Sequence, residues 1–396
     1  MSTLEQNLKK ELQQIKKQGL WREIKALRFV TPVMAIDRVG RKYLVFSSNN
    51  YLGLTHAPEV IAAVKAATEF GTGSTGSRLT TGCHFEANTL EKAVAKFKHT
   101  ESALLFNTGY MTNLGVIYGL LKQNDVVFSD ELNHASIIDG CRISKAVVKV
   151  YKHSDMRDLE RLLENHHVLG QSYIITDGVF SMDGDIANLP ELVKLAKKYS
   201  ACLYVDDAHA VGVIGEDGSG TAAYYGLEGQ VDLQVGTLSK ALGSEGGYVA
   251  GKKVFIDYLI NKSRPFIFST ALSPGSIAAA NAALILLANN PKRYLNKLQS
   301  NTKLMRKLLA DNGVKVIAGE TPIIPIIMGE AKLAARFAHR LQEEGILVSA
   351  IRPPTVRIGL SRIRLTITAA HSEEEIRFTA AKIATIWQEL KEGSDK

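Results

Sequence analysis

The chain of 396 residues is 45% hydrophobic and 22% charged, which is typical of a globular protein with room for a large and a smaller domain. Its net charge of +8 does not indicate nucleic-acid binding, because lysine and arginine are mostly mixed with aspartate and glutamate along the chain. A basic nucleic-acid-binding protein stays only as an alternative, testable by salt-sensitive retention on DNA.

Apolar runs and cysteines bear on location. The longest apolar stretch, residues 277–288, is interrupted by Asn281 and is too short to cross a bilayer, and the chain opens with charged residues. Cys83, Cys141 and Cys202 are odd in number and widely spaced, which is typical of a reducing compartment and excludes the usual zinc spacings. We therefore expect a cytoplasmic protein with no membrane span and no metal site.

The first predicted elements are an amphipathic, lysine-rich helix over residues 3–18 and a short strand pair around residues 42–46. Arg22 lies between them and is either a solvated side chain or a substrate contact. The sequence Asn49-Asn-Tyr-Leu-Gly53 then predicts a loop, in which asparagine side chains usually bond to local backbone.

Gly71-Thr-Gly-Ser-Thr-Gly76 matches the GxGxxG pattern, so a dinucleotide-binding oxidoreductase is the rival interpretation. That pattern needs a strand before it and a helix after it. Here Pro58 opens an alanine-rich helical run over residues 60–70 that leads into the glycines. The context favours a loop of small residues that lines a pocket next to Arg78.

A helix over residues 86–98 precedes a buried strand at residues 103–106 and a second helix that begins near Met111. The backbone amides at a helix start carry partial positive charge, so a phosphate group suits the position beside Gly109 and Tyr110. The plainer alternative is a strand-to-helix turn without a ligand.

Strands and helices alternate between residues 146 and 205, which predicts right-handed crossovers and a mostly parallel sheet. The expected strands are residues 125–128, 147–151, 173–176, 203–205 and 231–235, with helices at 156–164 and 189–198. Ligands bind outside the carboxyl ends of such strands. The side chains expected there are Ser181, Asp206, His209, Thr237 and Lys240.

Lys240 is the residue on which the functional interpretation depends. Its neighbours are small or apolar, so we expect its amine to lose hydration and to become a nucleophile that can hold an aldehyde cofactor as a Schiff base. For a pyridine ring held in this way, Asp206 can pair with the ring nitrogen and His209 with the phenolic oxygen, which favours pyridoxal 5'-phosphate (PLP). Ser181 and Thr237 carry hydroxyls suited to that oxygen or to the phosphate. Taken singly, Lys240 could be a surface lysine, and residues 206–209 could be a metal-binding or a solvated turn.

His134 follows the strand at residues 125–128. Asp177 lies at the end of another strand and could orient the His134 side chain. A structural histidine is the alternative.

Longer helices predominate beyond residue 275, with two strands between them, which predicts a smaller α+β domain. The helices are expected at residues 274–287, 293–312 and 332–344, and the strands at 323–327 and 364–368. The last helix begins with a capping box of Ser372 and Glu375.

The segment between Glu344 and Glu373 contains no acidic residue but includes four arginines, which predicts an anion site. They are Arg352, Arg357, Arg362 and Arg364. Thr355 follows two prolines that fix its backbone.

Five motifs, in family order, resemble the α-oxoamine synthase family of PLP enzymes. They are Asn49-Asn-Tyr-Leu-Gly53, Ser129-Asp-Glu-Leu-Asn-His-Ala-Ser136, Val179-Phe-Ser-Met-Asp-Gly184, Asp206-Asp-Ala-His209 and Thr237-Leu-Ser-Lys240. The resemblance covers about residues 40 to 370. It implies an α/β protein of PLP-dependent transferase fold type I, with an N-terminal arm (1–56) packing on the small domain, a large PLP-binding domain (57–275) and a small C-terminal domain (276–396).

The resemblance also implies roles for individual residues. Lys240, His134, Asp206 and His209 are the expected catalytic residues, with His134 stacked on the pyridine ring. Arg364 and Asn49 are expected to hold the amino-acid carboxylate, and Arg22 to border the substrate entrance. Arg362 is expected to be solvated or to face coenzyme A, and the Thr355 hydroxyl could be aimed at the acyl substrate. Thr270 is expected to reach a phosphate in the neighbouring subunit of a homodimer.

The implied reaction is the decarboxylative condensation of an amino acid with an acyl thioester. Residues 351–356 and 76–82 resemble the family branch that joins L-alanine to a pimeloyl thioester in biotin synthesis. Residues 129–140 and 321–325 resemble the branch that transfers acetyl groups to glycine just as closely. We expect the first reaction, with coenzyme A or a carrier protein as the acyl donor.

Overall fold

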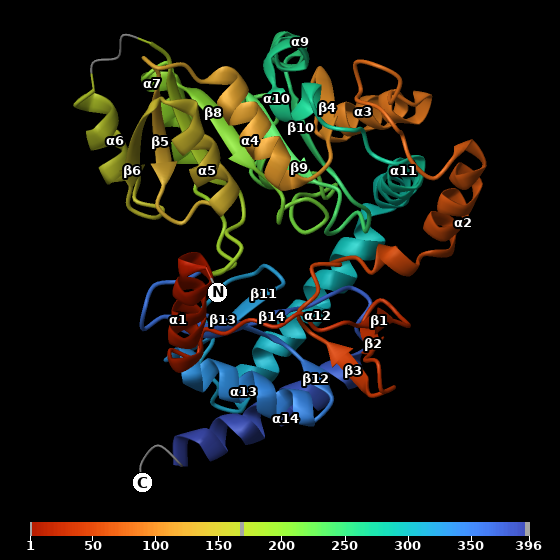
Figure 1. The fold of residues 1–396 in the computed structure, drawn as a ribbon, viewed down its shortest axis with the longest axis vertical. Helices are drawn as coiled ribbons and strands as arrows, with labels where there is room; N and C mark the ends of the chain where they lie inside the picture. The colour runs from red at the N-terminus through yellow and green to blue at the C-terminus, as the bar shows by residue number, and fades with distance from the viewer. Residues whose placement is uncertain (1, 167–169, 393–396) are drawn as a thin grey trace. The chain divides into compact units, whose positions relative to one another are not determined.

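The computed structural model describes residues 2–166 and 170–392 of the chain, which forms two compact units (Figure 1). Unit 1 consists of Met1–Asn49, Met182–Gly184 and Leu298–Lys396, and unit 2 of Asn50–Ser181 and Asp185–Lys297. The domain bounds expected from the sequence stay a prediction. The compact units differ from them in placing residues 50–56 and 276–297 in unit 2 and residues 182–184 in unit 1.

Unit 2 contains a seven-stranded sheet in the order β4-β10-β9-β8-β7-β5-β6. Its strands are β4 (Ser102–Phe106), β5 (Val126–Asp130), β6 (Val147–Tyr151), β7 (Ser172–Asp177), β8 (Cys202–Asp206), β9 (Leu233–Thr237) and β10 (Gly247–Gly251). The five strands β5 to β9 are parallel, and β10 is antiparallel to both of its neighbours. The predicted, mostly parallel sheet is thus confirmed.

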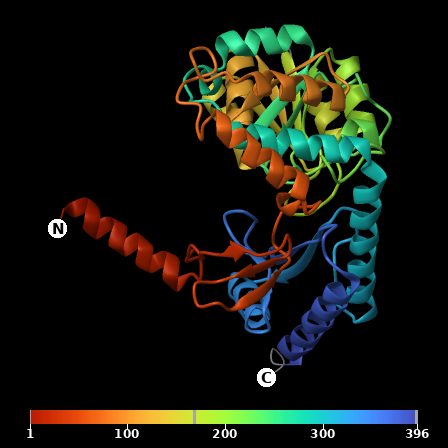
Figure 2. The same ribbon diagram turned by 90° about the vertical axis from the view of Figure 1, so that its right-hand side faces the viewer.

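Alternating side chains of these strands form two separate cores, because successive residues of a strand point to opposite faces of the sheet. Phe128, Ile174 and Leu203 lie in one core, whereas Ile175 and Tyr204 lie in the other. Both views show helices on either side of this sheet (Figure 1; Figure 2). Helices α6 (Met156–Glu164) and α7 (Leu189–Lys198) cover the first face, and α4 (Gly109–Leu120), α5 (Ala135–Ser144), α9 (Lys253–Lys262) and α10 (Arg264–Ile267) the second.

The remaining helices of unit 2 surround the edge of the sheet at β4. They are α2 (Pro58–Ala67), α3 (Phe85–Phe97) and α11 (Pro274–Asn289), with short 3₁₀ turns at Leu54–His56 and Thr68–Phe70, whereas the short helix α8 (Thr221–Tyr224) adds Ala222 to the core under α6 and α7. Helix and 3₁₀ turn, not a strand, precede the glycines that start at Gly71, so the requirement for a dinucleotide fingerprint is not met.

Unit 1 contains two small sheets, in the orders β1-β2-β3-β12 and β11-β14-β13. The strands are β1 (Arg28–Phe29), β2 (Met34–Ile36), β3 (Lys42–Val45), β11 (Ile323–Gly329), β12 (Ile346–Leu347), β13 (Ser349–Ile351) and β14 (Ser361–Thr366). The helices are α1 (Thr3–Lys17), α13 (Ala331–Glu343) and α14 (Glu373–Glu392), together with most of α12 (Pro291–Asp311). β3 pairs in parallel with β12, so the N-terminal and C-terminal parts of the chain share one sheet.

Helix ends agree with their sequence signals. Ser372 and Glu375 form the predicted capping box, in which each side chain accepts a hydrogen bond from the other residue's backbone amide. Helix α4 begins at Gly109, two residues before the predicted start, because the Thr108 side chain caps it by accepting from the Met111 amide at 3.0 Å. Among the described residues no helix is both long and apolar enough to cross a membrane.

Candidate active site

The candidate site lies where three parallel strands of unit 2 end. Asp177 at the end of β7 is paired in register with Asp206 at the end of β8, and Asp206 is paired with Val235 of β9. Parallel strands end at a common edge of a sheet, so the polar residues after β7, β8 and β9 gather there. The sequence predicted this convergence from strand exits alone.

Asp206 is buried and held from two sides. Its Oδ1 atom accepts a hydrogen bond from the Ala208 amide at 2.9 Å, and its Oδ2 atom accepts one from Asn113 Nδ2 at 2.7 Å. Both donors are neutral, so the carboxylate keeps lone pairs that a cationic ligand can use. This arrangement fits a partner for a protonated ring nitrogen.

Lys240 lies three residues beyond β9, half-buried in a bend. Its positive charge acts on two other groups of the site, His134 and Asp177. Burial lowers the pKa of His134, and Lys240 lowers it further, against the carboxylates of Asp206 and Asp139. Burial and the charge of Asp206 raise the pKa of Asp177 well above its usual range, against the His134 amide and Lys240. The lysine, the histidine and both carboxylates thus form one electrostatic cluster.

His134 is oriented by its surroundings. Its backbone amide donates to Asp177 Oδ2 at 2.9 Å, so Asp177 orients it through the backbone. The Tyr110 ring meets the imidazole edge-on, with centroids 6.4 Å apart, and the Tyr110 hydroxyl hydrogen-bonds to Asp139, which raises the pKa of Tyr110. The histidine is therefore a held side chain with one ring nitrogen hydrogen-bonded to Ser136.

His209 is buried, and its Nδ1 atom lies 2.6 Å from the hydroxyl of Tyr51, which is also buried. The expectation from the sequence had drawn on the Asn49–Gly53 motif for Asn49 alone and had missed Tyr51. A buried tyrosine hydroxyl needs a hydrogen-bond partner. The place of Tyr51 inside the Asn49–Gly53 motif was the sequence signal that could have pointed to its role.

Gly109, where a phosphate site was expected, lies in close contact with strand β9. A Cβ atom on Gly109 would lie 3.3 Å from Thr237 Cβ, so the first residue of α4 packs directly against the last residue of β9. Thr237 Oγ1 donates its hydrogen to the Gly246 oxygen at 2.9 Å and lies 2.7 Å from Ser239 Oγ. The backbone amides of a helix start form a suitable anion site, and Gly109 belongs to it, beside Thr237.

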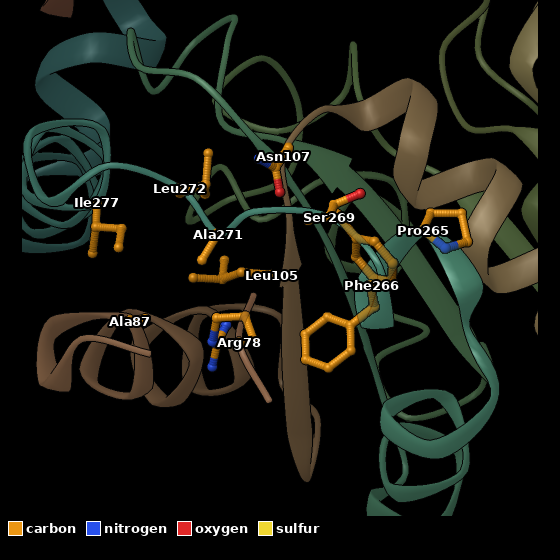
Figure 3. A pocket seen from close by; sticks show the side chains of 11 residues that line it. Arg78, Ala87, Leu105, Asn107, Pro265, Phe266, Ser269, Ala271, Leu272 and Ile277 are labelled. Atoms are coloured by element: carbon orange, nitrogen blue, oxygen red, sulfur yellow. The ribbon is translucent and has the colours of Figure 1, made fainter. Parts of the chain in front are cut away.

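Ser181 lies in the turn closed by the Val179–Ile186 bridge, after the end of β7. Thr270 is exposed, and its backbone oxygen accepts from Asn107 Nδ2 at 2.7 Å. The cavity drawn in Figure 3 lies beside this segment, between Arg78, Phe266 and Ser269, and has a volume of about 10 Å³. That volume holds about one water molecule, so this cavity is not a substrate site.

In unit 1, Arg364 is buried on β14, and its Nη1 atom donates to Asn49 Oδ1 at 3.1 Å and to Thr366 Oγ1 at 2.9 Å. The two residues expected to hold a carboxylate are therefore neighbours. The solvated position expected for Arg362 is wrong: it is buried and forms an ion pair with Asp183 at 2.5 Å. Arg362 and Arg364 are two residues apart and so lie on the same face of β14, and the sequence did not reveal the acid 179 positions away that meets Arg362.

Arg22 and Thr355, also in unit 1, are exposed. Burial and the charge of Arg22 lower the pKa of Arg352, so these two arginines are close enough to act on each other. Arg352 donates hydrogen bonds to the backbone oxygens of Gly19 and Trp21. Thr355 lies in a turn in which its amide donates to the Arg352 oxygen at 3.1 Å.

The sequence of residues 41–383 matches the family described as aminotransferase class I and II. The chain belongs to this family. Its fold is the fold type I of PLP-dependent transferases, with a mostly parallel sheet in the larger unit.

Among curated proteins, the chain is 48% identical over 383 residues to an 8-amino-7-oxononanoate synthase of Lysinibacillus sphaericus, covering 96% of this chain and 98% of that protein. It is also 48% identical over 385 residues to the 8-amino-7-oxononanoate synthase 2 of Bacillus subtilis (strain 168), covering 97% and 98%. These similarities extend through both units.

Two solved structures are informative. A serine palmitoyltransferase from S. paucimobilis, with a bound PLP-myriocin aldimine, is 31% identical and has a TM-score of 0.93, covering 99% of this chain and 100% of that one. An 8-amino-7-oxononanoate synthase from Francisella tularensis is 29% identical and has a TM-score of 0.75, covering 88% and 99%. The fold is therefore shared by enzymes with different acyl substrates.

Proposed function

We propose that this chain is a PLP-dependent acyltransferase that condenses L-alanine with a pimeloyl thioester to form 8-amino-7-oxononanoate in biotin synthesis. The observation that carries the proposal is the identity of 46–48% to curated proteins of that name over more than nine-tenths of the chain. The site in unit 2 supports it, because its groups match what the cofactor needs.

The residues of unit 2 fit PLP. Asp206 is a buried carboxylate held by neutral donors, which suits a protonated ring nitrogen, and the start of helix α4 at Gly109, beside Thr237, offers backbone amides for a phosphate. When bound, PLP withdraws electrons from the bond to the α-carbon of an amino acid. We assign the phosphate to Gly109, Tyr110, Thr237 and Ser181, and the phenolic oxygen to His209.

Lys240 has two tasks in this proposal. Its amine holds the cofactor before substrate arrives, and its Nζ atom then takes the α-proton of alanine. His134 limits the motion of the ring and is available for proton transfer. The cluster suits these tasks because Lys240 acts electrostatically on both His134 and Asp177.

Arg364 and Asn49 are the proposed carboxylate-binding pair for the amino acid. Arg364 Nη1 is already oriented by Asn49 and Thr366, so the guanidinium loses little freedom when it binds a carboxylate. We propose Arg22 and Thr355 as contacts of the acyl substrate, which their exposure permits.

Serine palmitoyl transfer is the second candidate, because the TM-score to serine palmitoyltransferase exceeds that to the Francisella synthase. A backbone match reports the fold, whereas the choice of acyl chain depends on a few side chains. The higher sequence identity to 8-amino-7-oxononanoate synthases therefore favours the pimeloyl substrate. Acetyl transfer to glycine is the remaining branch.

The test is a comparison of substrate pairs. We expect release of carbon dioxide and coenzyme A to be fastest with L-alanine plus pimeloyl-CoA, slower with glycine plus acetyl-CoA and slower still with L-serine plus palmitoyl-CoA. Faster turnover of either of the other pairs would refute the proposed substrates and leave the cofactor assignment in place. A protein that stays colourless after PLP is added would refute both.

We also propose a homodimer in which Thr270 of one subunit reaches the phosphate bound by the other. Sedimentation would detect the dimer, and a mixture of inactive Lys240→Ala and Thr270→Val chains would regain activity if sites are shared. A cytoplasmic location is the further proposal, supported by three cysteines that are all free thiols.

A further inference from the structure

A chain of buried hydrogen bonds joins Asp206 to His134 through Asn113 and Ser136. Asn113 Nδ2 donates to Asp206 Oδ2 at 2.7 Å and to Ser136 Oγ at 2.8 Å. Ser136 Oγ in turn lies 2.7 Å from His134 Nδ1. Asn113 and Ser136 are almost fully buried, so water does not compete with these bonds.

The direction of the chain follows from the carboxylate at one end. Asp206 already accepts from the Ala208 amide and acts as an acceptor, so the amide group of Asn113 must present its NH₂ to it. The Asn113 oxygen then faces the Tyr204 hydroxyl, which donates to it. Both hydrogens and the oxygen of the Asn113 amide are thereby used, and this side chain has one orientation.

The same logic continues to His134. Ser136 Oγ accepts one hydrogen of Asn113 and has a single hydrogen of its own, which is left for His134 Nδ1. The backbone amide of Ser136 also points at Nδ1, at 3.3 Å. Two donors therefore face this nitrogen, and an atom that accepts cannot carry a proton.

We propose that Asn113 and Ser136 are positioning residues that, with Asp206 as the fixed acceptor, hold His134 as the neutral tautomer with its proton on Nε2. The lowered pKa of His134 is consistent with a neutral ring. The charged groups that act on this ring are Asp206, Lys240 and Asp139.

This inference deepens the proposed function and rests on it for its consequence in catalysis. A neutral imidazole adds no second positive charge beside Lys240, and it offers an N–H donor at Nε2. Without these side-chain hydrogen bonds, Nδ1 would keep only the longer contact with the Ser136 backbone amide, at 3.3 Å, so His134 would populate both tautomers and would lose the Nε2 donor in part of the molecules.

The decisive measurement is the ring-nitrogen NMR spectrum of the full chain labelled at histidine, recorded both without cofactor and with PLP bound. The signals of His134 are assigned by their absence in His134→Gln. We expect an unprotonated Nδ1 and a protonated Nε2 in the native protein near pH 8. Ser136→Ala and Asp206→Asn should each give a mixture of tautomers. The first removes the hydroxyl that donates to Nδ1, and the second removes the carboxylate that fixes the orientation of the Asn113 amide.

Two variants serve as controls. Ser136→Thr keeps the hydroxyl and should keep the native tautomer. Ser144→Ala removes a buried hydroxyl from the same helix, one that donates to the Cys141 oxygen at 2.7 Å and lies outside the chain of bonds, so it should leave the His134 signals unchanged.

Kinetics give a second readout. Loss of one hydrogen bond in Ser136→Ala should lower kcat about three- to tenfold, with KM for alanine changed less than twofold. A native tautomer in Ser136→Ala, or an equal change in Ser144→Ala, would overturn the proposal. The NMR result without cofactor does not depend on substrate, so it can fail or succeed separately from the proposed function.

Discussion

Asp206 and Asp207 are neighbours at the end of β8, are both buried, and have opposite surroundings. Asp207 forms an ion pair with Lys98 at 2.7 Å and accepts from Thr221 Oγ1 at 2.5 Å. Asp206 accepts from an asparagine amide and a backbone amide. Successive side chains at the end of a strand point to opposite sides, so one sequence step separates the two environments.

The difference shows how a fold keeps one buried charge available. A buried carboxylate that meets an internal cation is neutralised, and it stabilises the structure only while the pair is intact. A buried carboxylate held by neutral donors stays able to bind a cation from outside. On this basis we assign Asp207 to structure and Asp206 to the cofactor.

The largest expected effect is on the reaction rate, and it distinguishes Lys240 from Lys98. Lys240→Ala should lower the rate of condensation by at least about 10²–10⁴-fold, because it removes the group that moves the α-proton, and should abolish visible absorbance. Its free energy of unfolding should change little, since Lys240 is half-buried in a bend. Assays of carbon dioxide release and denaturant titrations measure both. Retained turnover in this variant would contradict the assignment of Lys240.

Lys98→Met should do the reverse. It leaves Asp207 buried without its cation, so we expect the free energy of unfolding to fall by about 3–5 kcal/mol. Lys194→Met is the matched control, because the pair of Lys194 with Glu191 is exposed and is worth about 0–1 kcal/mol. Equal losses in the two variants would remove the structural role given to Asp207.

Two arginines on one strand extend the comparison to unit 1. Arg364→Ala should raise KM for alanine about 10–100-fold through loss of a charge-assisted bond, with PLP affinity unchanged. Arg362→Ala should instead lower stability, because it breaks the buried pair with Asp183. Equal weakening of amino-acid and cofactor binding in Arg364→Ala would count against its role.

His153 tests internal neutralisation by pH. Its ring nitrogens lie 3.0 Å from Asp130 and 2.8 Å from Asp185; burial lowers the pKa of His153, but these two hydrogen-bonded carboxylates outweigh it and raise the pKa to about 10. The folded-state pKa exceeds the unfolded value near 6.5, so the stabilisation is complete below about pH 6.5 and is lost as pH rises through about 10.

His153→Gln should lower the free energy of unfolding by about 1.5 kcal/mol near pH 6.5 and by less above pH 10. Denaturant titrations of both proteins across that range measure the difference. A loss that does not change with pH would show that the charge of His153 contributes nothing.

Much of the site could be predicted because strand exits are visible in the sequence. The alternation of buried strands and helices located Asp206, Thr237 and Lys240 at one edge, and chemistry of the side chains indicated the cofactor. Asn113 could not be found in this way, since it lies inside helix α4 and becomes relevant only because α4 packs over the end of β8. Tyr51 and Asp183, the partner of Arg362, were missed because their contacts join residues that are 158 and 179 positions apart in the sequence.

The sequence by itself determined most strands of the large sheet, the polar residues near their ends and the family of chemistry, because these depend on local periodicity and residue type. Only the tertiary structure decided which of two adjacent aspartates meets a lysine and which meets an amide. Lys98 and Asn113 are 109 and 93 positions away from their partners, and contacts over such separations depend on packing that no local pattern contains.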